Sequence, residues 1–89
     1  MTPKLIETVV RTALPDDEEV LSSPGDGAKA IILNSTGGAI ADLCDGTRTI
    51  AEIAGFIVDL VSGAELACVL RDVEQLVQEL EAVGLLEQT

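Results

Sequence analysis

The chain has 89 residues, 16 acidic and five basic, and its formal net charge is −11. Apolar residues make up 47% of it, which excludes a disordered chain, and its length predicts one domain over residues 1–89. No apolar run is long enough to span a bilayer and no signal-peptide pattern opens the chain, so we expect a cytoplasmic protein without a membrane role.

The residue types argue against catalysis. Histidine, the commonest general base and metal ligand, is absent, which speaks against a hydrolase triad and a zinc site. One Phe and no Trp or Tyr leave no stacking platform for bases or flavins. Cys44 and Cys68 lie among apolar helix positions without CxxC spacing, so we expect two buried free thiols. The sequence therefore predicts a protein that is not an enzyme and uses no cofactor or metal.

The first third of the chain predicts short strands. A β-branched run between Leu5 and Leu14 indicates the first strand, and residues 15–18 (PDDE) form a turn. Glu19 to Ser22 can form a second strand, residues 23–27 (SPGDG) a loop, and Lys29 to Leu33 a third strand. This spacing is typical of a small antiparallel sheet.

A capped helix and a tight turn follow. Residues 34–36 (NST) carry side-chain oxygens that can accept hydrogen bonds from the free amides of a helix N-terminus. Apolar residues then recur at helical spacing as far as Cys44, which predicts a helix over residues 35–44. Gly46 can take the left-handed conformation that ends a helix.

A capping box of Thr49 and Glu52 predicts a second helix over about residues 50–61. Its apolar face consists of Ile50, Ile53, Phe56 or Ile57, Leu60 and Val61. A third helix is expected over about residues 65–83, with an apolar stripe of Leu66, Val69, Leu70, Val73, Leu76, Val77, Leu80 and Val83. Gly84 is a natural residue to end it, and Leu85 then contacts Leu80.

Three short strands followed by three helices, with a helix-turn-helix in the middle, predict an α+β domain of the winged helix-turn-helix type. Such folds often bind DNA, but the third helix carries five acidic residues, Glu65, Asp72, Glu74, Glu79 and Glu81, against the single Arg71. A duplex would be repelled along it, so no nucleic-acid partner is expected. An acyl carrier protein is excluded because no serine follows an aspartate. A winged-helix regulator acting through protein partners or DNA stays as the alternative function.

The stretch from Leu33 to Ile53 reads LNSTGGAIADLCDGTRTIAEI. The order and spacing of its motifs resemble the PqqD family, named for coenzyme pyrroloquinoline quinone (PQQ) synthesis. That family belongs to the recognition elements for ribosomally synthesised and post-translationally modified peptides (RiPPs). The resemblance continues at lower specificity through VLRDVEQLVQELEAVGLLE to Glu87.

The resemblance implies a winged-helix fold and a non-catalytic peptide-binding role. In such proteins the leader of a precursor peptide lies along the third strand, in a groove shared with the third helix. The module presents the precursor to a modifying enzyme, a radical SAM enzyme in PQQ synthesis or another enzyme in a related pathway. An edge strand offers the unpaired backbone groups that this mode needs.

Carried onto this chain, the resemblance points to a strand and to one surface of a helix. The strand residues are Lys29, Ala30, Ile31, Ile32 and Leu33, and the helix residues are Val69, Leu70, Val73 and Leu76. Core packing is the other role open to each of them, and periodicity alone does not say which stripe of the helix faces the groove. The sequence also leaves open whether two copies form a homodimer.

Overall fold

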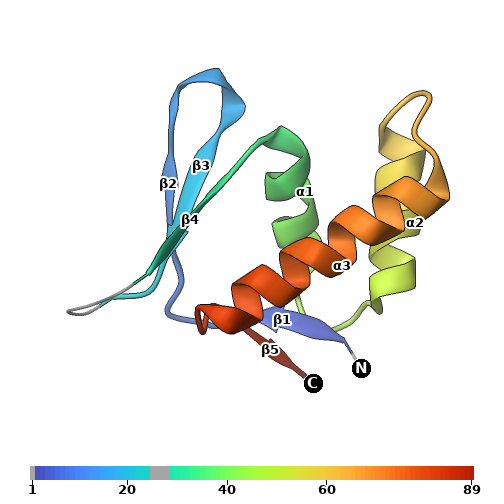
Figure 1. The fold of residues 1–89 in the computed structure, drawn as a ribbon. Coiled ribbons are helices and arrows are strands. Elements are labelled where there is room, and N and C mark those ends of the chain that lie inside the picture. Colours follow the sequence, from blue (N-terminus) through green and yellow to red (C-terminus); the bar gives the residue numbers. More distant parts are fainter. Residues whose placement is uncertain (1, 25–28) are drawn as a thin grey trace.

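The computed structural model describes residues 2–24 and 29–89 (Figure 1). Three strands form an antiparallel sheet in the spatial order β2 (Val10–Ala13), β3 (Glu19–Ser22) and β4 (Ala30–Leu33). Three helices follow in the chain, which confirms the predicted winged helix-turn-helix-like α+β architecture. Of the predicted loop over residues 23–27, residues 25–27 lie outside the described part.

The β2–β3 hairpin begins later than the sequence pattern predicted. Thr8 lies in a turn, and the strand starts at Val10 because its pairing partner β3 is only four residues long. A 3-10 turn over Pro15–Asp17 reverses the chain, with Asp16 and Asp17 at φ angles of 63° and 61°. Aspartate tolerates this left-handed region because its short side chain can hydrogen-bond locally.

The helices are α1 (Ser35–Leu43), α2 (Ile50–Leu60) and α3 (Leu66–Ala82). Each lies within about a residue of the predicted bounds, which is the usual uncertainty of a helix end. Across the described ranges, no helix has both the length and the apolar character required to cross a membrane.

Local side-chain signals begin the first two helices as predicted. At α1 the amide of Gly37 donates to the side chain of Asn34 over 2.8 Å. At α2, Thr49 and Glu52 form the reciprocal capping box, with each side chain accepting from the other residue's amide. These bonds satisfy amides that a helix N-terminus leaves without partners.

Helix α3 ends in the predicted way. Gly84 has a φ of 77°, and its amide donates to the carbonyl of Glu81. The amide of Leu85 donates to the carbonyl of Leu80 over 2.9 Å, which completes a Schellman motif. Both leucine side chains are fully buried, so this end of the helix is fixed in the core.

A second sheet, which the sequence analysis missed, joins the two ends of the chain. β1 (Pro3–Leu5) pairs antiparallel with β5 (Leu86–Gln88). On its other side β1 meets the α1–α2 turn: the amide of Leu5 donates to the carbonyl of Cys44, and the amide of Gly46 donates back to β1, each over 3.0 Å. Figure 1 accordingly shows both termini close together below the helices.

The hydrophobic core lies between α3 and the strands and helices that pack against it. Its members come from β3, β4, the three helices, the residue after α1, and the start of β5 with the residue before it: Leu21, Leu33, Ile40, Ala41, Cys44, Ile53, Ala54, Ile57, Val69, Val73, Val77, Leu80, Leu85 and Leu86. On α3 the buried positions follow a spacing of four, four and three residues, which is one stripe of a helix.

Two predictions about burial were wrong. Cys44 is buried as predicted, but Cys68 is exposed; both are free thiols. On α2, Leu60 and Val61 of the predicted apolar face are 71% and 42% exposed, while Ile57, of the two alternatives Phe56 and Ile57, is the core residue. These side chains are exposed because the last turn of α2 and the first turns of α3 project beyond the part of the molecule that the sheets cover (Figure 1).

Candidate functional site

Strand β4 forms one edge of its sheet, since β3 pairs with only one of its two sides and no other described strand pairs with it. Its side chains alternate: Ile31 and Leu33 face inward, while Ala30 and Ile32 face outward. Ile32 is 64% exposed, so it presents apolar surface beside this edge. An edge of this kind offers backbone amides and carbonyls, together with an apolar contact, to another extended chain.

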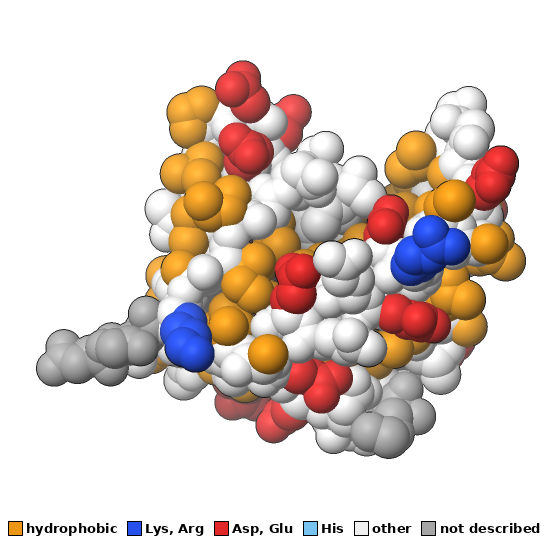
Figure 2. Space-filling view, in the orientation of Figure 1, with side chains coloured by type: hydrophobic (Ala, Val, Ile, Leu, Met, Phe, Trp, Pro, Cys, Tyr) orange, Lys and Arg blue, Asp and Glu red, His pale blue; other side chains and the backbone are white. Residues whose placement is uncertain are grey.

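A groove of about 410 Å³ lies between the end of β4, the start of α1 and one side of α3. It is lined by Ile32, Leu33, Asn34, Thr36, Gly37, Ile40, Asp72, Gln75, Leu76 and Glu79. Figure 2 shows this face, with hydrophobic side chains along the strands and acidic side chains over α3. The groove therefore has an apolar base near β4 and a polar wall on α3.

The structure separates the residues that the family resemblance suggested. Ile32 and Leu33 of β4 and Leu76 of α3 line the groove. Lys29, Ala30 and Ile31 belong to β4 or the residue before it, outside the cavity itself. On α3, Val73 is 0% exposed and Val69 is 8% exposed, so both serve the core, and the half-buried Leu70 packs against that core.

Sequence analysis missed the polar wall of the groove. Asp72, Gln75 and Glu79 are exposed and lie on one side of α3 with Leu76 between them. Their separations of three, four and seven residues are those of neighbours on one helix face. The spacing is visible in the sequence, but the sequence does not show that this face of α3, rather than another, borders the groove.

The start of α1 packs closely on the end of β4. A Cβ atom on Gly37 would lie 3.3 Å from both the Cβ of Leu33 and the Oδ1 of Asn34. These contacts are tighter than most side chains permit, so glycine at this position lets the first turn of α1 form one wall of the groove.

An ion-pair network joins the hairpin to α1. Two nitrogens of Arg11 in β2 donate hydrogen bonds to the carboxylate of Glu19 in β3, at 3.0 and 2.5 Å. Its third nitrogen donates to Asp42 of α1 at 2.6 Å. The pKa of the Arg11 guanidinium is raised above its ordinary value, and the hydrogen bond to Glu19 is the largest cause. A Cβ on Gly38 would lie 2.8 Å from the Glu19 carboxylate, so a larger residue there would displace this carboxylate from its present position. This clamp holds the sheet that carries β4 in a fixed relation to α1.

The turn after α1 is also stabilised by side-chain hydrogen bonds and has a structural role. Asp45 accepts hydrogen bonds from the amide and hydroxyl of Thr47 and pairs with Arg48 at 2.8 Å. The hydroxyl of Thr47 is the first cause of the lowered pKa of Asp45. Gly46, at a φ of 85°, presents its amide to β1. We assign this motif to fixing the N-terminus of the chain.

The described side chains offer little that could drive a reaction. Burial raises the pKa of the Cys44 thiol to about 11, so it is not a thiolate nucleophile at neutral pH. Within residues 2–24 and 29–89, no three His, Cys, Asp or Glu side chains lie close enough to hold a metal ion. What the site offers is an open strand edge, apolar surface and unpaired carboxylates.

This fold and groove define a class: a small winged-helix-like domain with an edge strand beside a long helix, an arrangement suited to binding an extended peptide. A model of the family described as coenzyme PQQ synthesis protein D (PqqD) matches residues 18–86, from the start of the β3 region to β5. The chain belongs to the PqqD family. The resemblance seen in the sequence is thereby confirmed.

A solved structure extends the likeness to nearly the whole chain. The protein described as TbiB1 in complex with the TbiA(beta) leader peptide is 28% identical, with a TM-score of 0.76 over 97% of this chain and 96% of that chain. A comparison with curated proteins gives no match. The fold is therefore shared with a protein whose structure was solved with a leader peptide.

Proposed function

We propose that this chain is a peptide-binding module that recognises the leader of a ribosomally synthesised precursor through the groove between β4 and α3. The observation that carries the proposal is the open edge of β4 beside that groove. Membership of the PqqD family and the full-length likeness to TbiB1, which holds a leader peptide, support the same function.

The proposed mode is strand addition. The leader extends the β2–β3–β4 sheet as a further strand and gains affinity from main-chain hydrogen bonds to residues 29–33. Alternate side chains of the leader then point into the groove, where Ile32 and Leu76 offer apolar contact and the core residue Ile40 lies at its base. Among the helix residues first suggested, Leu76 carries the proposal, whereas Val69, Leu70 and Val73 support it only by positioning α3.

The module itself is proposed to be non-catalytic. Its residues bind and orient the precursor, and a separate tailoring enzyme performs the chemistry, a radical SAM enzyme or another RiPP-modifying enzyme. We place this function in the cytoplasm, where a newly made precursor first becomes available.

Fluorescence anisotropy tests the proposal. Synthetic leader peptides from precursor genes encoded near this one would be titrated with the protein, beside scrambled versions and a mixed-sequence DNA duplex. We expect saturable binding of one leader and no binding of its scrambled version or of DNA. Binding of the duplex without binding of any leader would contradict the proposal and favour the regulatory alternative.

A further inference from the structure

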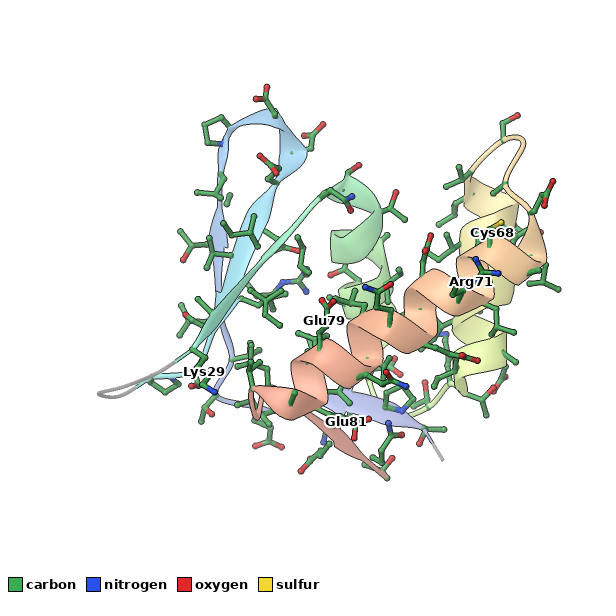
Figure 3. The ribbon with its side chains drawn as sticks, viewed as in Figure 1. Lys29, Cys68, Arg71, Glu79 and Glu81 are labelled. Atoms are coloured by element: carbon green, nitrogen blue, oxygen red, sulfur yellow. The ribbon has the colours of Figure 1, made fainter. Side chains whose placement is uncertain are left out.

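We infer that the leader recognised by this chain carries at least two basic residues, Lys or Arg, which pair with Asp72 and Glu79. The inference deepens the proposed function and rests on it. Asp72 and Glu79 line the groove from α3, and both are exposed. Figure 3 shows Glu79 on the side of α3 that faces β4 and α1, with Glu81 on the opposite side.

The charge of these carboxylates is not neutralised within the described structure. Glu79 accepts a hydrogen bond from the neutral amide of Gln75 at 3.3 Å, and among the described residues neither Glu79 nor Asp72 has an ion pair. No lysine or arginine appears among the residues that line the groove, as far as the structure describes the chain. By contrast, Glu19 of β3 and Asp42 of α1 are already paired, because both bind Arg11.

The distance between Asp72 and Glu79 determines how many basic residues the leader needs. Asp72 and Glu79 are two turns apart, about 10 Å along the helix axis, so one cationic side chain cannot pair closely with both. An extended chain covers that distance in about three residues at ~3.3 Å each. Long Lys and Arg side chains extend this reach, so basic residues two to four positions apart satisfy both carboxylates.

The apolar contacts complete the recognition pattern. Ile32 and Ile40 lie in the same groove as the two carboxylates. A matching leader therefore places apolar side chains toward β4 and α1 and basic side chains toward α3. An acidic or neutral leader would leave both carboxylates without partners, and an acidic one would also be repelled by a chain of net charge −11.

Selection from a random peptide library tests the inference without knowledge of the natural precursor. The library would be panned against wild-type protein and against a D72N/E79Q variant, with an E74Q/E81Q variant as control. The control removes the same charge from the same helix at residues outside the groove. We expect wild type and control to enrich peptides with paired Lys or Arg, and the D72N/E79Q variant to lose that enrichment.

Affinities of the selected peptides give a second readout. We expect the D72N/E79Q variant to bind them about three- to tenfold more weakly, as exposed ion pairs allow, and added salt to erase the difference. Enriched peptides without a basic bias, or equal loss in both variants, would overturn the inference while leaving the proposed function intact. Failure of wild type to enrich any peptide would contradict the proposed function itself.

Discussion

Ile32 of β4 and Leu76 of α3 lie in the walls of one groove, although 44 positions separate them in the sequence. The strand side chain is 64% exposed and the helix side chain is half-buried. The pair thus offers apolar surface beside an unpaired strand edge, which an extended peptide can cover.

Replacing Ile32 by serine should weaken leader binding by at least about tenfold. Fully burying an isoleucine contributes about 1.5–3 kcal/mol, and about 1.4 kcal/mol corresponds to a factor of ten. The matched control is Leu60→Ser, which removes a similarly exposed side chain, 71% against 64%, from the far end of α2. Titration of both variants checks this, and equal weakening by the two would show that the groove is not the binding site.

Removing the Arg11 clamp should loosen the hairpin. We expect Arg11→Gln to lower the free energy of unfolding by about 1–2 kcal/mol, between the values for exposed ion pairs and for charged hydrogen bonds. Arg11→Lys should recover only part of the lost stability, because an ammonium group has one nitrogen and cannot form both hydrogen bonds to Glu19 in the same geometry. Urea denaturation measures both, with Arg71→Gln as a control at an exposed arginine. An unchanged stability of Arg11→Gln would mean that the clamp contributes nothing.

Alanine at two glycines should change stability in opposite directions. Gly46 has a φ of 85°, so Gly46→Ala should destabilise the fold by about 1–2 kcal/mol. Gly55 lies inside α2, and a methyl group added there would meet nothing within 4 Å, so Gly55→Ala should stabilise the fold by about 0.5–1 kcal/mol. Thermal melts of the two variants test this, and a shift in the same direction for both would refute it.

The contribution of Asp45 should depend on pH. Its pKa is lowered in the folded protein, so its carboxylate stabilises the fold above the unfolded-state pKa of about 4. That stabilisation is lost as the pH falls through the lower folded-state pKa. Asp45→Asn should therefore reduce the free energy of unfolding at pH 7 and have little effect near pH 2. Denaturation curves at both pH values check this; an equal loss at both would contradict it.

Local signals allowed much of the fold to be predicted. The Asn34 cap, the Thr49–Glu52 capping box and the Gly84 turn each depend on residues within a few positions of one another, and each forms as expected. Such interactions require no knowledge of the rest of the chain. The helix bounds followed directly from them.

The features that were missed depend on distant parts of the chain. β1 pairs with β5 more than 80 residues away, and three-residue strands are too short to show an alternating pattern. The apolar residues Leu60 and Val61 look like core in the sequence, but the α2 end projects beyond the sheets. The groove side of α3 likewise depends on where β4 packs, so Asp72 and Gln75 could not be assigned from periodicity alone.

Hydrogen exchange of the β4 amides, measured by NMR with and without a bound leader peptide, tests the central claim most directly. If the leader adds to the edge of β4, exchange should slow at alternate amides of residues 29–33, because a new strand bonds every second residue on that edge. Exchange in the α2 end around Leu60 should stay unchanged. Saturable binding that leaves the β4 amides as fast as before would contradict strand addition.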